Sequence, residues 1–399
     1  MKQFFVMALA AAAVVGCSKK EGAPAPTGPG EQLNIVTSIA TSPSQSVTKS
    51  SIDGSTLPVG SVIGVHLADG TTTTNDFTPG NTSGNGNYLY YTSGRNVRFS
   101  NAAGANIWAS VDEDENTKLL LFQNSETAKV YAYYPYVTEE EAATVLEGNG
   151  DATTLQIPLL LTGAIDASTY DGDAVKVATA DDEKDYMYHK DVSETVVGAA
   201  TTTTAKLVMN HALARVAFIV YTSQDAQQAI QGDGTSYYRL DGYTIKNKAQ
   251  GADLKLNAPY AKMALKDGTI TPGADGGQID RTITNYKMQK NEVGDGVAAI
   301  GASSKVGNLV YPISITNDGS KSTAMEVVFH IARVATGDIA NSPVGYAIPF
   351  TVNSGDNVTK WEAGKSYTYT VKFTGNSLSI ETVTVTDWVE ANGGDMEIE

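Results

Sequence analysis

The sequence predicts an all-β protein with two β-sandwich domains and one or two short helices, and three observations lead to this prediction. Beyond residue 31, apolar and polar residues alternate with a period of two in stretches rich in Thr, Val, Ile and Tyr. Turn-forming pairs such as Asp267-Gly268 and Asp318-Gly319 separate these stretches. The chain has 399 residues, more than one hydrophobic core usually serves, so two domains are expected.

The amino terminus has the features of an export signal followed by a spacer. Lys2 supplies a positive charge, and Phe4–Val15 is an apolar run too short to span a membrane permanently. The run ends in Val-Val-Gly-Cys at Cys17, the only cysteine, and this sequence resembles the bacterial lipobox. We therefore expect a lipoprotein signal peptide at residues 1–16, a lipid on Cys17 and a flexible linker at residues 17–30. The alternative is an inert free or buried thiol.

The strands of the body follow from the same alternation. The first is expected at Leu33–Ala40, with Leu33, Ile35 and Ile39 on one face. Central strands of a sandwich, apolar on both faces, are expected at Leu119–Phe122, Val130–Tyr136, Leu207–Met209 and Val216–Tyr221.

Two segments have helical signals. An acidic capping box begins at Thr138, and Gly148 would end that helix. The second segment, Ser223–Ile230, lies near the middle of the chain. We place the domain boundary there, which gives an N-terminal sandwich at residues 31–225 and a C-terminal sandwich at residues 226–399.

A hairpin is predicted near the carboxyl terminus. Tyr367–Phe373 alternates cleanly, and Gly375-Asn376 turns the chain. The next run begins with Leu378 and Ile380 on even positions and continues with apolar residues on odd positions. A β-bulge near Glu381-Thr382 would keep Leu378, Ile380, Val383 and Val385 all facing inward.

Composition excludes several classes of function. The chain has 44 acidic and 28 basic residues, a formal charge of −16, so it lacks the clustered cations that bind nucleic acid. One cysteine cannot form a disulfide within the chain, and four scattered histidines offer little for a metal site. We expect no cofactor, no metal and no enzymatic activity.

Three sets of residues partly match the patterns of chemical sites, and a structural role is expected for each. Gly364-Lys365-Ser366 is like the end of a phosphate-binding loop, but a strand follows it instead of a helix. The acidic run Asp112–Asn116 lacks the glycine and the closing glutamate of a calcium loop, so a solvated turn is expected. The histidines, His66, His189, His211 and His330, are expected to have structural roles.

Several stretches taken together resemble the fimbrillin family of lipoprotein pilins and fimbrillin-like proteins of Bacteroidales-type (type V) fimbriae. The resemblance rests on the order and spacing of these stretches between Cys17 and Trp388. Beside the lipobox they are Val47-Thr48-Lys49, Leu57–Val65, Val130–Tyr136, Asp185–Tyr188, His211–Val216, Trp361–Tyr369 and Asp387-Trp388.

The resemblance implies two transthyretin-like domains and export to the outer membrane as a lipoprotein. It implies assembly into fimbriae when a trypsin-like protease cuts after the first strand and a strand of another subunit fills the groove. Lys49 is the only basic residue between Lys20 and Arg95, so cleavage between Lys49 and Ser50 would displace Leu33, Ile35 and Ile39. The alternative is an ordinary surface lysine. The candidate donor is the tail after Trp388, where Met396 and Ile398 alternate with acidic residues.

The leading functional hypothesis is therefore a structural and adhesive subunit of surface fimbriae. Its partners would be other fimbrial subunits, a trypsin-like protease, the outer membrane through the lipid, and surface ligands of host or bacterial cells. The alternative is a surface glycan-binding lipoprotein that does not polymerise, with an aromatic platform of Tyr88, Tyr90, Tyr91 or Trp108. Cross-strand packing is the other interpretation of these aromatic residues.

Overall fold

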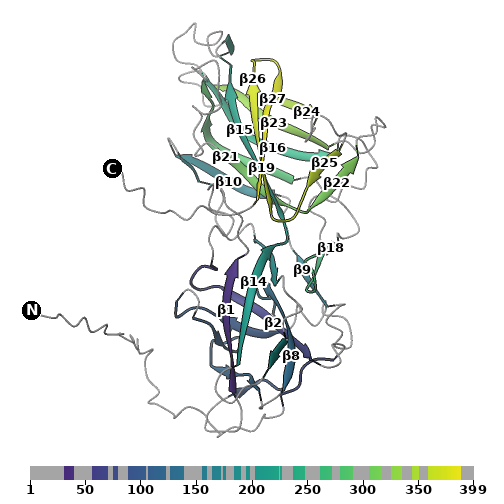
Figure 1. Ribbon diagram of the computed structural model, residues 1–399. Helices are drawn as coiled ribbons and strands as arrows, with labels where there is room; N and C mark the ends of the chain where they lie inside the picture. The colour runs from purple at the N-terminus through teal and green to yellow at the C-terminus, as the bar shows by residue number, and fades with distance from the viewer. Residues whose placement is uncertain are drawn as a thin grey trace, which may run out of the picture.

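The structure is nearly all β. The computed structural model describes residues 31–39, 56–70, 75–79, 89–104, 107–122, 126–138, 155–159, 164–171, 174–176, 184–189, 195–197, 203–223, 225–226, 237–247, 261–271, 279–290, 305–316, 325–334, 344–349 and 358–387. Strands dominate these residues, which confirms the predicted fold class. Figure 1 shows them as two groups stacked along the long axis of the molecule.

The lower group in Figure 1 is built on a nine-stranded sheet. Its strand order is β5 (Ala109–Ser110), β4 (Val97–Ser100), β2 (Val62–Asp69), β8 (Thr127–Tyr134), β12 (Met187–His189), β14 (Thr203–His211), β1 (Glu31–Ile39) and β7 (Leu121–Phe122), with β13 (Thr195–Val197) also on β8. A short pair, β3 (Leu89–Tyr90) and β6 (Lys118–Leu119), lies outside this sheet. The inward side chains of β1, β2, β4, β8 and β14 meet in one core.

The upper group is a sandwich of two sheets. One has the order β11 (Ala174–Lys176), β10 (Ala164–Asp171), β19 (Ile279–Lys287), β16 (Tyr237–Asn247), β23 (Met325–Val334) and β24 (Val344–Pro349). The other has β20 (Gln289–Lys290), β15 (Ala214–Thr222), β26 (Lys365–Phe373) and β27 (Leu378–Asp387), with β21 (Lys305–Val310) also on β15. The pair β22 (Ile313–Thr316) and β25 (Val358–Trp361) lies beside them.

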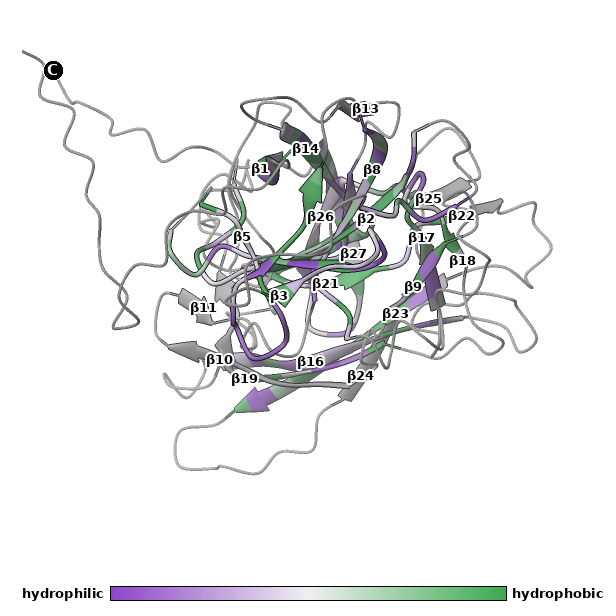
Figure 2. Cartoon of the chain, turned by 90° about the horizontal axis from the view of Figure 1, so that it is seen from below, coloured by the Kyte–Doolittle hydropathy of each residue, from purple (hydrophilic) through white to green (hydrophobic). Residues whose placement is uncertain are grey.

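Phe218 of β15 lies at the centre of this second core. Its ring centroid is 4.9 Å from that of Tyr243 and 5.2 Å from that of Phe329, both on the facing sheet. Edge-on contacts of this kind add to the free energy gained by burying the rings. Figure 2 shows green apolar and purple polar stretches within the same strands, the pattern expected of strands with one buried face.

The predicted carboxyl-terminal hairpin is confirmed. Strands β26 and β27 pair antiparallel, and the register shifts so that Thr370 faces Thr382 while Val371 faces Ile380. Glu381 is the extra residue of the bulge. Leu378, Ile380 and Val383 pack against the second core. The prediction was wrong for Val385, which is 47% exposed because it lies near the end of an edge strand.

The predicted central strands differ in burial. Every residue of β15 is buried, as expected. In β14, within the expected range, Leu207 and Met209 are buried and Val208 on the other face is half-buried. The two faces differ because only one face of β14, with Ala205, Leu207 and Met209, packs against the core.

A small third sheet and an apolar cluster join the two groups. The sheet has the order β18 (Ile270–Thr271), β17 (Ala261–Ala264) and β9 (Gln156–Leu159), and Figure 1 places β9 and β18 between the two groups. We call the cluster the junction cluster. Its buried members are Ala68, Tyr131, Tyr133, Val137, Leu155, Ile157, Leu159, Tyr186, Ala212, Leu213, Met263, Leu265, Leu309 and Tyr311.

The chain crosses from the lower group to the upper group at Ala212 and Leu213, between β14 and β15. The Ala212 N–H donates to the carbonyl oxygen of Tyr186 at 2.8 Å, and the Gly364 N–H donates to that of Leu213 at 2.8 Å. Strands β10 and β11 come earlier in the chain yet pair with the upper group. The proposed division at residue 225 stays a prediction.

The two helical segments have different outcomes. Asp225 and Ala226 are helical, and the Ser223 hydroxyl oxygen accepts the Ala226 N–H at 3.1 Å, as an N-cap does. The remainder of that segment lies outside the described residues. The segment from Thr138 to Gly148 lies outside them too, apart from Thr138 itself.

Gly268→Ala tests the contact between the β17–β18 turn and the lower group. A Cβ atom at Gly268 would lie 2.1 Å from the Tyr188 ring, and Gly268 has φ +69°. Gly364→Ala is the matched control, because Gly364 has φ +70° but a Cβ atom there would meet only the His211 carbonyl oxygen, at an ordinary van der Waals distance of 3.8 Å. Both variants should lose about 1–2 kcal/mol of unfolding free energy to the left-handed backbone. Gly268→Ala should lose about 1–3 kcal/mol more, because Tyr188 must move. Equal losses in urea unfolding would contradict this contact.

Candidate functional site

The first strand is held by backbone pairing almost entirely on one side. Strand β1 pairs in parallel with β14 over seven residues, from Leu33 opposite Thr203 to Ile39 opposite Met209. On its other side it pairs with β7 only at Glu31 and Gln32, and the Leu33 N–H donates to the Leu120 carbonyl oxygen at 3.1 Å. Beyond Leu33, that second edge of β1 has no strand partner among the described residues.

The inward face of β1 supplies part of the first core. Leu33, Ile35 and Ile39 are 1%, 4% and 5% exposed and lie in the first core, as the sequence alternation predicted. Val36 on the opposite face is 50% exposed. Taking β1 away would therefore open an apolar groove in which three aliphatic side chains now lie.

Two side-chain hydrogen bonds tie β1 to the region of β5, at the far end of the strand order. The Gln32 amide Nε2 donates to the Ser110 hydroxyl oxygen at 2.7 Å. The Trp108 indole Nε1 donates to the Thr37 hydroxyl oxygen at 3.1 Å. Thr37 is 4% exposed and shares the inward face with the three aliphatic residues. No motif or periodicity in the sequence marks Gln32, Thr37 or Ser110 as functional, because each bond joins residues far apart in the chain.

The other predicted site residues lie outside the described residues. They are Cys17, Lys49, Ser50, Met396 and Ile398. Their expected roles in lipidation, cleavage and strand donation stay predictions. No helix among the described residues has the length and apolar character needed to span a bilayer.

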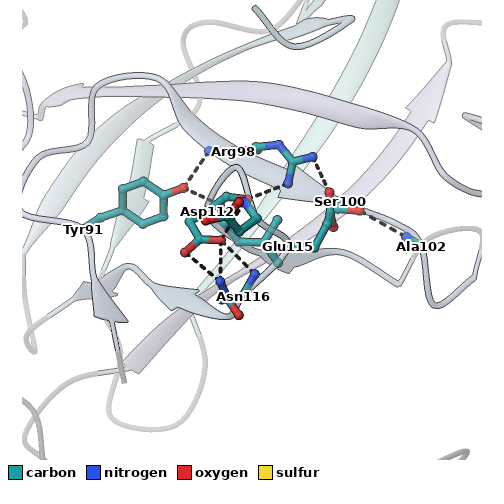
Figure 3. Close-up of polar contacts among 9 residues, drawn as sticks. Tyr91, Arg98, Ser100, Ala102, Asp112, Glu115 and Asn116 are labelled. Atoms are coloured by element: carbon teal, nitrogen blue, oxygen red, sulfur yellow. Dashed lines mark hydrogen bonds and ion pairs between the residues drawn. The ribbon is translucent and has the colours of Figure 1, made fainter. Parts of the chain in front are cut away.

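The acidic run at Asp112–Asn116 forms a turn that its own side chains organise (Figure 3). Asp112 Oδ1 accepts the backbone N–H groups of Asn116 at 2.8 Å and Asp114 at 3.0 Å. Arg98 pairs with Glu115 and donates to the Asp112 carbonyl oxygen at 2.8 Å. These contacts confirm the predicted turn. Among the described residues, no group of three or more His, Cys, Asp or Glu could hold a metal ion.

The histidines make separate contacts in different parts of the fold. His189 Nδ1 accepts the Val208 N–H at 3.0 Å, and His211 Nδ1 lies 3.0 Å from Asp185 Oδ1. Asp185 is therefore a partner of His211, although the two residues are 26 positions apart in the chain.

His66 is fully buried on β2, and neither of its ring nitrogens has a hydrogen-bond partner in the described structure. Its Nε2 lies 3.6 Å from Asp76 Oδ1, and Arg95 lies 3.6 Å from the other oxygen of Asp76. Burial, and next the positive charge of Arg95, lower the pKa of His66 from 6.5 to about 3. The imidazole is therefore neutral near pH 7.

Two of the aromatic residues considered for a glycan platform, Tyr91 and Trp108, are engaged in packing and hydrogen bonds. Tyr91 is 7% exposed, its hydroxyl donates to the Val111 carbonyl oxygen at 2.6 Å, and Lys118 lies over its ring. Trp108 is half-buried with its N–H on Thr37, and the Tyr90 side chain is half-buried. Tyr88 lies outside the described residues. The described members thus match the packing interpretation.

Comparison with known proteins gives one family match that covers most of the chain. A family model described as fimbrillin-like matches residues 48–388. No curated protein gives a significant match.

Solved structures from Bacteroidales also resemble the chain. A candidate cell adhesion protein from Bacteroides uniformis ATCC 8492 is 14% identical with a TM-score of 0.46, covering 91% of this chain and 100% of that one. Another from Bacteroides ovatus ATCC 8483 is 13% identical with a TM-score of 0.49, covering 91% and 99%. The tip fimbrial protein Mfa3 from Porphyromonas gingivalis, with C-terminal truncation, is 10% identical with a TM-score of 0.40, covering 90% and 100%.

The buried His66 predicts a loss of stability in acid. Its pKa is lowered in the folded chain, so its contribution is fully present above about pH 6.5 and is lost as the pH falls toward 3. Between pH 7.5 and 4.5 this amounts to about 2–3 kcal/mol of unfolding free energy. His66→Leu replaces the titrating imidazole with an apolar side chain. The difference in unfolding free energy between pH 7.5 and pH 4.5, measured by urea unfolding, should therefore shrink by about 2–3 kcal/mol. An unchanged pH dependence would show that His66 does not titrate in this way.

Proposed function

Because the chain belongs to the fimbrillin-like family, we propose that it is a structural and adhesive subunit of surface fimbriae, exported as a lipoprotein and assembled by protease-triggered donor-strand exchange. Its partners are other fimbrial subunits. The lipid on Cys17 anchors the exported chain to the outer membrane until it is processed, and residues 17–30 separate that anchor from the first strand.

The attachment of β1 is the observation that carries this proposal. The strand contributes three buried aliphatic side chains and pairs along one edge with β14. Burying three such side chains stabilises the fold by about 5–9 kcal/mol at about 1.5–3 kcal/mol each. When β1 leaves, this stabilisation is lost and the edge of β14 is left without its partner. An incoming strand restores both, and that gain drives assembly.

Cleavage releases β1 because the contacts that remain are noncovalent. Lys49 lies between the end of β1 at Ile39 and the start of β2 at Val62. A cut between Lys49 and Ser50 therefore separates β1 from every other strand of the nine-stranded sheet. The cut fragment is then free to leave when a competing strand is present at sufficient concentration.

The first test is the cleavage position. Lys49→Ala should prevent trypsin-like cleavage after residue 49, whereas Lys49→Arg should preserve it, because both basic side chains fit such a protease. Amino-terminal sequencing of parental protein recovered from the cell surface should give a start at Ser50. Protease-treated Lys49→Arg protein should form ladders on a gel, and Lys49→Ala protein should not. Assembly of Lys49→Ala chains at the parental level would refute the cleavage step.

The second test is the donor tail. Replacing both Met396 and Ile398 with Ser should stop polymerisation, because about 1.5–3 kcal/mol of burial is lost at each position. Glu397→Ser is the matched control, since residue 397 lies on the other face of an extended strand. Polymer length is measured by size-exclusion chromatography after protease treatment. Unchanged polymerisation after deletion of Asp395–Glu399 would exclude this tail as the donor.

A further inference from the structure

We propose that Trp108 makes the groove left by β1 selective for strands with a Ser or Thr at the position of Thr37. The preferred occupant of this groove is a strand of a different exported subunit. This inference rests on the strand exchange proposed above and adds a rule for the sequence of the partner. The pattern is aliphatic, aliphatic, hydroxyl and aliphatic at alternate positions, as in Leu33, Ile35, Thr37 and Ile39.

Thr37 is the one polar residue among the described inward-facing residues of β1. It is 4% exposed and lies between Ile35 and Ile39 on that face. A buried hydroxyl raises the free energy of the folded state unless it is hydrogen-bonded. The Trp108 indole N–H lies 3.1 Å from its oxygen and donates to it. The buried hydroxyl of Thr37 on β1 thus has a hydrogen-bond donor, the Trp108 indole N–H, on the part of the protein that faces it.

Trp108 belongs to the part of the protein that stays when β1 leaves. It lies immediately before β5, is half-buried and packs against the first core. The indole N–H can only donate a hydrogen bond. If an aliphatic side chain occupied the position of Thr37, that N–H would face a methyl group and lose its acceptor. Sites built around a hydrogen bond discriminate strongly against partners that lack it.

The remaining contacts of the groove discriminate less. The ladder along β14 uses backbone groups, which every strand except one with proline can supply. The positions of Leu33, Ile35 and Ile39 are apolar and accept aliphatic side chains of similar volume. The Gln32–Ser110 hydrogen bond lies at the amino-terminal end of the strand, where Gln32 is half-buried. Position 37 is therefore the strongest point of selection.

The tail of this chain does not match the pattern. Residues 388–399 contain no Ser or Thr, and Met396 and Ile398 alternate with Asp395, Glu397 and Glu399. The tail of a second copy would consequently fill this groove more weakly than a strand that has the pattern, so assembly of this chain with itself needs a higher subunit concentration. The favoured partner is a different subunit whose donor strand has a hydroxyl residue two positions before an aliphatic residue.

The test uses the mature chain with a specific protease site inserted after Lys49, so that cleavage does not depend on the native protease. The cut protein is titrated with labelled peptides of residues 31–39 that have Thr, Ser or Val at position 37. Val has nearly the shape of Thr but no hydroxyl. The Thr and Ser peptides should bind within about threefold of each other, and the Val peptide about tenfold more weakly.

Trp108→Phe completes the comparison, because Phe keeps a ring against the core and removes the N–H. In this variant the Thr and Val peptides should bind within about twofold of each other, which isolates the pairwise contact. A peptide of residues 388–399 should bind parental protein at least about tenfold more weakly than the Thr peptide.

Each outcome is decisive. Equal binding of the Thr and Val peptides to parental protein would overturn the inference while leaving strand exchange intact, and this arm needs no folded variant. Tight binding of the 388–399 peptide would overturn the choice of a different subunit. Failure of every peptide to bind would overturn strand exchange itself and this inference with it.

Discussion

The parallel ladder between β1 and β14 is the interaction on which the lower half of the protein depends. It joins the first described strand to the strand that comes last in chain order in the same sheet, and it aligns Leu33, Ile35 and Ile39 over the core. Two parallel strands cannot be joined by a tight turn, so the chain between them must pass through other elements. Here the rest of the sheet is that connection, so β1 completes a core to which the strands between it and β14 also contribute.

The contacts of β1 differ in how far they depend on its side chains. The β14 edge is satisfied by backbone groups and is indifferent to side chains. By contrast, Gln32 and Thr37 bond to Ser110 and Trp108 through their side chains. Along most of its length, β1 can therefore leave by breaking one backbone ladder, the one with β14. Its side-chain hydrogen bonds still distinguish it from other strands.

The junction cluster gives the two sandwiches a shared core. Leu213 lies on the crossing between them, Leu155 and Ile157 come from the first half of the chain, and Met263 and Tyr311 come from the second. Strand β9 pairs with β17 across the same boundary. An apolar cluster reinforced by a sheet restrains motion of the two sandwiches relative to each other.

The sequence by itself determined the features that depend on local periodicity and turn chemistry. These include the inward face of β1, the bulged hairpin at Glu381, the strand after Gly364 and the acidic turn at Asp112, because alternation and turn residues act over a few positions. Tertiary structure alone decided the parallel partner of β1, the Trp108–Thr37 hydrogen bond across 71 residues, the Tyr188–Gly268 contact and the burial of His66. A period of two specifies which face is buried and not which strand lies alongside, since pairing is settled by packing between residues far apart in the chain.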